Sequence, residues 1–249
     1  MLRIQNITKI FNKGKEDEVR ALDNLSLQIN KGEFVVVVGA NGSGKSTLMN
    51  LILGSYAPTS GQLLIDDNDI TPLPEYQRSQ WVSMVFQNPA MGTAPDLSVI
   101  ENFRLAALRT KSKKLSIGND EAFHQLVKEK IKTLGLGLES KTVQPMGSLS
   151  GGQRQALTLL MGVMDKTSIL LMDEPTAALD PKSSAVILQL AEKINRELGI
   201  TIILITHSMK DALQYGNRLL HFKAGKLEHD LNADQKRQLQ LNQLYDWFG

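Results

Sequence analysis

Residues 34–47 read FVVVVGANGSGKST, an apolar run that leads straight into a glycine-rich loop. The run Phe34–Val38 contains only β-branched and aromatic side chains, with no polar alternation. This pattern is typical of a strand in a parallel sheet, because helices cover both faces of such a sheet. The loop Gly39–Thr47 follows the run and continues into a helical segment, Ser46–Leu53. The sequence therefore predicts a strand, a loop and a helix, in this order.

The loop matches the P-loop pattern G-x-x-x-x-G-K-[ST], which binds phosphates. Its glycines permit backbone angles and close approaches that a side chain would prevent. Successive N–H groups, with the positive end of the following helix, can then surround phosphate oxygens. Lys45 adds a positive charge near the β- and γ-phosphates, and the Ser46 hydroxyl can ligate Mg²⁺. The predicted nucleoside triphosphate contacts are Gly39, Ala40, Asn41, Gly42, Ser43, Gly44, Lys45, Ser46 and Thr47.

Two other apolar runs, Ile169–Met172 and Thr201–Ile205, have the same character as the first. The segment Ser183–Leu198 between them has apolar residues at helical spacing, and alternating strands and helices indicate a parallel α/β sheet. By contrast, Leu2–Asn30 alternates apolar and polar residues around a charged loop, as an antiparallel hairpin does. The predicted fold is therefore α/β, with an antiparallel β subdomain at the edge of a parallel sheet.

The pattern between residues 88 and 164 is helical. Val99–Leu108 and Glu121–Leu134 are amphipathic and indicate a helical subdomain inserted into the α/β core. The basic stretch Arg109–Asn119 between them reads as a solvated loop rather than a nucleic-acid contact, because no aromatic residues interleave it. In the tail, four residues would lie on a single helix face. These are Leu241, Leu244, Tyr245 and Phe248. Packing of this face on the chain's own core is favoured over a contact with a partner.

Two acids follow the run Ile169–Met172. Ligands gather at the carboxyl ends of parallel strands, so Asp173 and Glu174 are expected to face the phosphate loop. Asp173 is placed to hold Mg²⁺, and Glu174 to act as the general base on an attacking water.

Polar residues also end two further apolar runs. His207 follows Thr201–Ile205 and could reach the same γ-phosphate. Gln87 follows Val82–Phe86, and its amide oxygen could touch Mg²⁺ or the attacking water. A lone histidine or glutamine is more often structural, so both predictions depend on the position of these residues at strand ends beside a P-loop.

Residues 149–153 read LSGGQ, which resembles the signature motif of ABC ATPases. The other motifs stand in the order of that family, and the resemblance covers Leu2–Gly225. They are the P-loop, Gln87 in FQNP (86–89), the signature, DEP (173–175), ALD (178–180) and His207. The resemblance implies one domain over residues 1–249. Its expected parts are an ATP-binding P-loop NTPase core (1–87 and 165–230), a helical signature subdomain (88–164) and a C-terminal helical tail (231–249).

The resemblance also implies residue roles. Phe11 matches the aromatic residue that stacks on adenine. The signature, Ser150, Gly151 and Gly152 with Gln153, would bind the γ-phosphate of the ATP held by a second copy of the chain. A glycine-rich helix start is an anion site in its own right, so ATP would bridge two copies and hydrolysis would open them. Asp180 would couple the two sites.

Composition sets limits on the partners. With 42% hydrophobic and 22% charged residues the chain is ordinary globular protein, and a net charge of +2 does not predict a nucleic-acid surface. No cysteine is present, which fits a reducing cytosol. We see no signal peptide and no apolar run long enough to cross a bilayer, so a membrane part must come from other chains.

The resemblance therefore implies ATP and Mg²⁺ as cofactors, a second copy of the chain, transmembrane permease subunits and, indirectly, a solute-binding protein. The expected location is cytoplasmic, on the inner face of the cell membrane. GTAP (92–95), residues 149–160 and YGNR (215–218) look like subunits of bacterial importers labelled tryptophan/tyrosine type, which suggests an aromatic amino acid. Pro175 departs from those relatives, which commonly carry histidine there. Residues 87–98 form a slightly longer stretch where a membrane partner would dock.

Other functions share part of this pattern. An export or lipoprotein-release motor would carry every motif above, and only residues 87–102 bear on that choice. DNA-repair ATPases have very long coiled-coil insertions between the P-loop and the signature, whereas residues 48–148 contain no sustained heptads. A GTPase is disfavoured because no N-K-x-D motif follows the P-loop.

Overall fold

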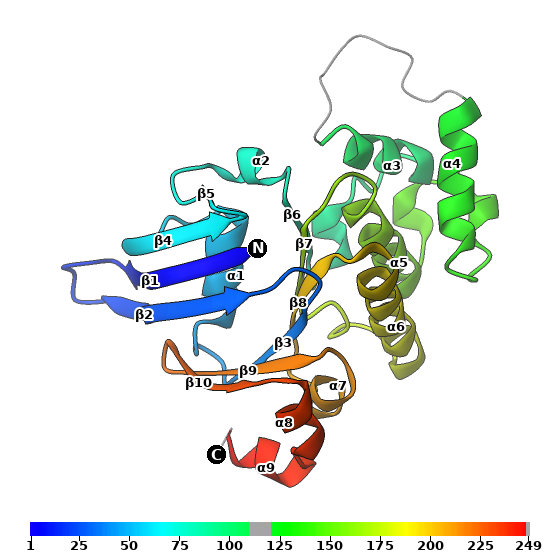
Figure 1. Cartoon of the computed structure of the whole chain (residues 1–249). Coiled ribbons are helices and arrows are strands. Elements are labelled where there is room, and N and C mark those ends of the chain that lie inside the picture. Colours follow the sequence, from blue (N-terminus) through cyan, green and yellow to red (C-terminus); the bar gives the residue numbers. More distant parts are fainter. Residues whose placement is uncertain (110–120, 248–249) are drawn as a thin grey trace.

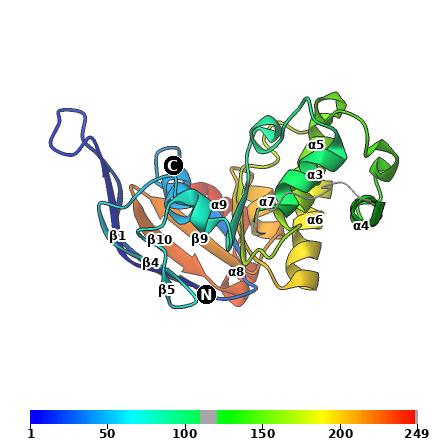
Figure 2. The ribbon, with the colours of Figure 1, turned by 90° about the horizontal axis from the view of Figure 1, so that it is seen from above.

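The computed structural model describes residues 1–109 and 121–247 of the chain. All of the expected basic loop except Arg109 therefore lies outside the described residues, and so does Phe248. Figure 1 shows two sheets on one side of the molecule and a group of helices on the other. Figure 2, the view from above, shows the same division, with α3, α4 and α5 beside the strands.

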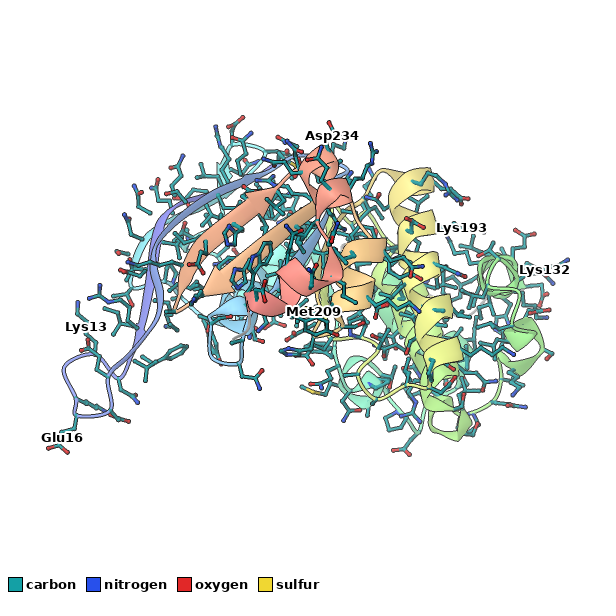
Figure 3. All side chains as sticks on the ribbon, turned by 90° about the horizontal axis from the view of Figure 1, so that it is seen from below. Lys13, Glu16, Lys132, Lys193, Met209 and Asp234 are labelled. Atoms are coloured by element: carbon teal, nitrogen blue, oxygen red, sulfur yellow. The ribbon has the colours of Figure 1, made fainter. Side chains whose placement is uncertain are left out.

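The first sheet is antiparallel, with the strand order β2-β1-β4-β5. Its strands are β1 (Leu2–Phe11), β2 (Val19–Ile29), β4 (Ser60–Ile65) and β5 (Asn68–Asp69). The hairpin predicted over Leu2–Asn30 is confirmed, because β1 and β2 pair antiparallel from Leu2↔Ile29 to Phe11↔Val19. The loop between them, which carries Lys13 and Glu16, projects away from the body of the molecule (Figure 3).

The second sheet has the order β10-β9-β3-β8-β7-β6. Its strands are β3 (Phe34–Val38), β6 (Val82–Val85), β7 (Ile169–Asp173), β8 (Thr201–Ile205), β9 (Arg218–Lys223) and β10 (Lys226–Leu231). All of them pair in parallel except β10, which pairs antiparallel with β9. The α/β class and the three buried parallel strands predicted from the sequence are confirmed. All five residues of β3 are buried.

Helices cover both faces of this second sheet, which explains the unbroken apolar runs. Successive residues of β3 point to opposite sides: Val35 and Val37 join the core beneath α1 (Lys45–Leu53). Phe34, Val36 and Val38 join a second core with α5 (Gly151–Gly162) and α6 (Pro181–Leu198). The helix predicted over Ser183–Leu198 is therefore confirmed, and it begins two residues earlier.

The helical region has a core of its own. It contains α3 (Val99–Ala107), α4 (Glu121–Lys132) and α5, with Phe103, Val127 and Leu157 completely buried among them. These helices confirm the two amphipathic segments predicted here. Short helices complete the chain: α2 (Glu75–Arg78), α7 (Met209–Gln214) and three 3₁₀ turns, Pro89–Gly92, Leu138–Lys141 and Met146–Ser148. Among the described residues, no helix is both long and apolar enough to cross a membrane.

The C-terminal tail is helical, as predicted. It forms two short helices, α8 (Ala233–Gln238) and α9 (Leu241–Asp246), and the three described residues of the predicted face, Leu241, Leu244 and Tyr245, all lie in α9. Leu244 is buried in the core shared with β3, whereas Leu241 and Tyr245 are exposed. Packing of the tail on the chain's own core is borne out through Leu244 and the half-buried Trp247.

A buried lysine fixes α8 in place. The Lys236 ammonium donates hydrogen bonds to the carbonyls of Tyr215 and Gly216, just beyond the end of α7. Burial lowers the pKa of Lys236 to about 8. Carbonyls at a helix end carry partial negative charge and satisfy the ammonium, so this lysine is a structural anchor of the tail.

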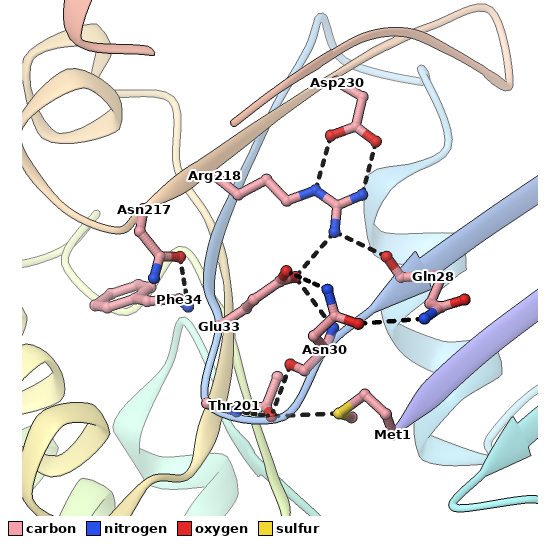
Figure 4. Close-up of polar contacts among 10 residues, drawn as sticks. Met1, Gln28, Asn30, Glu33, Phe34, Thr201, Asn217, Arg218 and Asp230 are labelled. Carbon is pink, nitrogen blue, oxygen red and sulfur yellow. Dashed lines mark hydrogen bonds and ion pairs between the residues drawn. The ribbon is translucent and has the colours of Figure 1, made fainter. Parts of the chain in front are cut away.

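An arginine network joins the two sheets (Figure 4). Arg218 on β9 donates two hydrogen bonds of 2.7 Å to the carboxylate of Asp230 on β10. Its third nitrogen donates to Glu33, at 2.9 Å, and to the carbonyl of Gln28 on β2, at 2.8 Å. The Arg218 side chain is only 16% exposed. Such a paired and part-buried guanidinium locks the antiparallel sheet onto the start of β3.

We expect Arg218→Met to destabilise the fold by about 2 kcal/mol, because two carboxylates would lose their charged partner in a part-buried site. The measurement is urea unfolding followed by circular dichroism. Arg20→Met is the matched control, because Arg20 also pairs with an aspartate, Asp23, but is 55% exposed. Its loss should shift the midpoint much less. Equal shifts for the two variants would contradict the role given to the Arg218 network.

Candidate active site

The P-loop lies between β3 and α1, as predicted, and its glycines are required by geometry. Gly39, Gly42 and Gly44 have φ angles of 150°, 78° and 104°, which side chains rarely adopt. A Cβ atom at Gly39 would collide with the carbonyl oxygen of Phe222, and one at Gly44 would lie 2.5 Å from the carbonyl oxygen of Ala21. Glycine therefore lets the loop pack tightly against β2 and the β9–β10 turn.

The loop encloses a buried positive charge. The Lys45 side chain donates hydrogen bonds to the carbonyls of Gly39, at 2.7 Å, and Ala40, at 2.9 Å. Burial lowers the pKa of Lys45, and the nearby carboxylates of Glu174 and Asp173 act in the opposite direction. A buried ammonium beside two neutral carbonyls is electrostatically suited to an anion.

A second observation supports an anion in this loop. The Ser43 hydroxyl is buried and has no hydrogen-bond partner among the described residues. Buried polar atoms are nearly always satisfied, so an orphaned hydroxyl inside a glycine loop indicates a place for a ligand. The loop and its lysine therefore fit a triphosphate.

Asp173 and Ser46 meet at the neighbouring strand end. Asp173 ends β7, and its carboxylate lies beside the Ser46 hydroxyl at the start of α1. Burial, and next the charge of Glu174, raise the pKa of Asp173, while Ser46, Lys45 and His207 act to lower it. A cation would stabilise the ionised carboxylate, and a carboxylate with a hydroxyl suits Mg²⁺. These two residues therefore fit the ion expected from the sequence.

Glu174 and His207 form a direct pair across the ends of β7 and β8. Nε2 of His207 lies 2.8 Å from Oε1 of Glu174. Glu174 has a φ of 47°, a left-handed conformation that is uncommon for a non-glycine residue and often marks a functional site. Its amide donates to the carbonyl of Ile205, which fixes this turn onto β8. The sequence placed both residues at this edge but did not predict that they touch.

A cavity of about 500 Å³ opens beside this pair. It is bordered by the two side chains and by residues of α6 and α7, including Ser184 and Tyr215. Glu174 therefore faces open space rather than packed side chains. Gln87, the remaining predicted contact, is exposed just beyond β6, the strand that pairs with β7. It lies at the carboxyl edge, as expected.

The LSGGQ segment begins helix α5. The Ser150 side chain accepts a hydrogen bond from the Gln153 amide, and the Gln153 side chain accepts one from the Ser150 amide. This reciprocal capping box fixes the helix start. Gly152 has no room for a side chain, because a Cβ would lie 2.9 Å from Ser183 at the start of α6. Ser150 and Gly151 are exposed.

The two glycine-rich segments have separate neighbours within one chain. The signature borders Leu179 and Ser183, whereas the P-loop borders Ala21, Phe222 and Gly225. The signature glycines are therefore bordered by residues at the start of α6 and not by the P-loop of the same chain. A helix start of this kind can bind an anion.

Phe11 packs against a second aromatic residue, Tyr56, which the sequence did not predict. Its ring packs edge-on against Tyr56, with centroids 5.4 Å apart, and the Lys9 ammonium lies 4.9 Å from its centre. Phe11 pairs with Val19 on β2, two residues before Ala21, whose carbonyl touches Gly44. Phe11 is therefore close to the P-loop side of the hairpin. Tyr56 lies in no recognisable motif, so sequence patterns could not have indicated it.

Comparisons with known proteins bear on this site. The family model for ABC transporters matches residues 22–177. A tyrosine transport ATP-binding protein from Clostridioides difficile (strain R20291) is 40% identical over 248 residues, which cover 100% of this chain and 98% of that relative. A methionine import ATP-binding protein from Corynebacterium jeikeium (strain K411) is 35% identical over 90% of this chain. The matched part is 58% of that relative's length.

Solved structures agree in fold. The dimeric structure of a post-hydrolysis state of the ATP-binding cassette MJ0796, bound to ADP and Pi, is 32% identical and has a TM-score of 0.80. It covers 94% of this chain and 99% of its own. A nucleotide-free ATP-binding cassette from an ABC transporter is 26% identical, with a TM-score of 0.81, over 99% of this chain and 95% of its own. This chain therefore belongs to the ABC transporter family and is an ATP-binding cassette that hydrolyses ATP.

Proposed function

We propose that this chain energises an importer of a small solute, with an aromatic amino acid of the tyrosine type as its substrate class. The observation that carries the proposal is the full-length match to the tyrosine transport ATP-binding protein. Relatives matched over 90% of this chain or more also carry import in their names, for methionine and for phosphonates, so import has wider support than the solute.

The contacts above support a set of residue roles at the nucleotide site. We propose that the P-loop amides and Lys45 hold the triphosphate, and that Phe11 stacks on the adenine. Asp173 and Ser46, with Gln87 as a further oxygen ligand, would hold Mg²⁺. When bound, Mg²⁺ neutralises part of the phosphate charge.

Glu174 is the proposed general base. Its carboxylate borders the open cavity, so one oxygen can accept a proton from an attacking water. The other oxygen, Oε1, lies 2.8 Å from Nε2 of His207. That contact restricts rotation of the carboxylate, so His207 would hold the base in position beside the γ-phosphate.

The active unit is proposed to contain two copies of the chain. In each copy the amides at Gly151 and Gly152 and the Ser150 hydroxyl would meet an anion held by the other copy. One ATP would then be held by the P-loop of one copy and the signature of the other. The MJ0796 cassette was solved as a dimer, which is consistent with this arrangement.

The surface beside β6 is the proposed permease contact. A groove of about 500 Å³ runs between β6, α3 and α5, and its rim carries the exposed side chains of Met91 and Leu105. Asn102 fixes the loop that forms one wall, because its amide donates to the carbonyls of Ala94, Leu97 and Ser98. A rigid groove with an apolar rim suits an amphipathic segment of a membrane subunit.

The test is reconstitution with the permease and solute-binding protein encoded beside this chain. We expect tyrosine, loaded on the binding protein, to stimulate ATP hydrolysis in proteoliposomes more than methionine or phosphonates do. Stimulation by methionine alone would overturn the substrate class and leave import standing. Neighbouring genes without a solute-binding protein, and export of a lipid or lipoprotein by the complex, would overturn import itself.

A further inference from the structure

The hairpin of β9 and β10 carries two histidines that face each other. His221 on β9 and His229 on β10 are direct partners in the antiparallel ladder. Their rings lie parallel, with an interplanar angle of 14° and centroids 5.4 Å apart. His221 is 1% exposed, so at least one imidazole is held in the interior of the protein.

A β-bulge adds a carboxylate to the same face. The ladder register shifts between Leu227 and His229, so Glu228 is the extra residue of β10. Side chains normally alternate between the faces of a strand, but a bulge re-aims one of them. Here it places Oε2 of Glu228 3.7 Å from Nδ1 of His221. Without the bulge, Glu228 and His229 would point to opposite faces.

The three side chains have the spacing of metal ligands. One ligand atom from each of His221, Glu228 and His229 lies within 4.8 Å of the other two. Ligands of a tetrahedral ion with bonds of about 2.1 Å are about 3.4 Å apart. The Nδ1–Oε2 distance of 3.7 Å is close to this value. Small side-chain rotations would bring the other ligand atoms, now within 4.8 Å, to the same separation.

The surroundings of this cluster leave space for one more ligand. The Trp247 ring stacks over His221, at 4.8 Å, and over His229, at 4.4 Å, and so covers the two imidazoles. A cavity of about 180 Å³ lies between Trp247, His221 and the P-loop residues Ala40–Ser43. It borders the cluster at His221 and can hold a water there.

We propose that His221, Glu228 and His229 bind a divalent transition-metal ion of the zinc class. Two imidazoles with one carboxylate are ligands that Zn²⁺ and Co²⁺ accept, whereas Mg²⁺ prefers oxygen ligands. The His221 imidazole is buried, and the neutral imidazole is the form that ligates metals. This site is chemically distinct from the Mg²⁺ ligands Ser46 and Asp173.

The test uses the full chain, stripped with EDTA and kept free of nucleotide and Mg²⁺. Titration with Co²⁺ is expected to give one ion per chain, a tetrahedral absorption band and quenching of Trp247 fluorescence. Trp247→Phe should keep the absorption band and remove the quenching. Equilibrium dialysis with Zn²⁺ should give the same stoichiometry.

Substitutions separate this site from the catalytic pair. His229→Gln and Glu228→Gln are expected to weaken Co²⁺ binding by about 10-fold or more. Even the loss of a residue that only hydrogen-bonds to a metal ligand lowers metal affinity by about 10-fold. Glu228 is exposed, so Glu228→Gln is expected to fold normally. It therefore still tests metal binding if His229→Gln fails to fold. His124→Gln, on α4, is the matched control and should change nothing.

Two results would overturn the proposal. The first is Co²⁺ binding that survives both His229→Gln and Glu228→Gln. The second is binding that is lost in His207→Gln and kept in His229→Gln, which would place the ion at the Glu174–His207 pair. Because nucleotide is absent throughout, neither result bears on the proposed transport function.

Discussion

Glu174→Gln is expected to lower the rate of ATP hydrolysis by about 10²–10⁴-fold, the typical contribution of a positioned general base. Glutamine keeps the size of the side chain and an oxygen that can lie against His207, but it cannot take the proton of the attacking water. ATP would therefore bind and remain intact, and two copies would stay closed on it. Steady-state phosphate release and size-exclusion chromatography with Mg²⁺ and ATP measure the two effects.

The matched control for this experiment is Lys45→Ala. Lys45 is buried in the phosphate loop, so its loss should weaken nucleotide binding itself and leave the chain monomeric with ATP. The two variants would then both be inactive but differ in oligomeric state. A Glu174→Gln chain that is monomeric in ATP and hydrolyses it at the normal rate would remove Glu174 from the role of base.

Much of this site was predictable because each motif sits at a strand end. The runs Phe34–Val38, Ile169–Met172 and Thr201–Ile205 are apolar throughout, which identifies strands covered on both faces. Parallel strands place their carboxyl ends at one edge, so Lys45, Asp173 and His207 had to converge. Their roles in ATP hydrolysis stay proposals, but their proximity follows from topology alone.

Features that depend on tertiary contacts were not predictable. The bulge at Glu228 is a single-residue register shift, and no local pattern in β10 indicates it. Lys236 has the sequence context of a surface lysine, yet its ammonium is buried against the carbonyls beyond α7. In the tail, the periodicity correctly grouped Leu244 with Leu241 and Tyr245 in one helix, but it could not show that Leu244 alone of these three is buried.

Ser150→Arg is expected to abolish ATP-driven association of two chains while leaving ATP binding by each chain unchanged. Ser150 begins α5, is exposed and lies away from its own P-loop, so its replacement does not touch the nucleotide held in the same copy. The bulky, charged arginine would instead fill the place where the γ-phosphate of the other copy's ATP would dock. Sedimentation with ATP in the hydrolysis-deficient Glu174→Gln background measures association, and a fluorescent ATP analogue measures binding.

Two controls separate this effect from simple loss of a helix cap, which costs about 1 kcal/mol. Ser150→Ala removes the capping hydroxyl without adding bulk, so it should weaken association far less than arginine. Ser98→Arg makes the same change at the capping box that begins α3, a helix with no proposed contact to ATP, and should leave association intact. If Ser150→Arg dimerised normally in ATP, the signature of one copy could not be closing on the phosphates of the other. Both glycine-rich segments would then have to act within one chain, in spite of their separate neighbours.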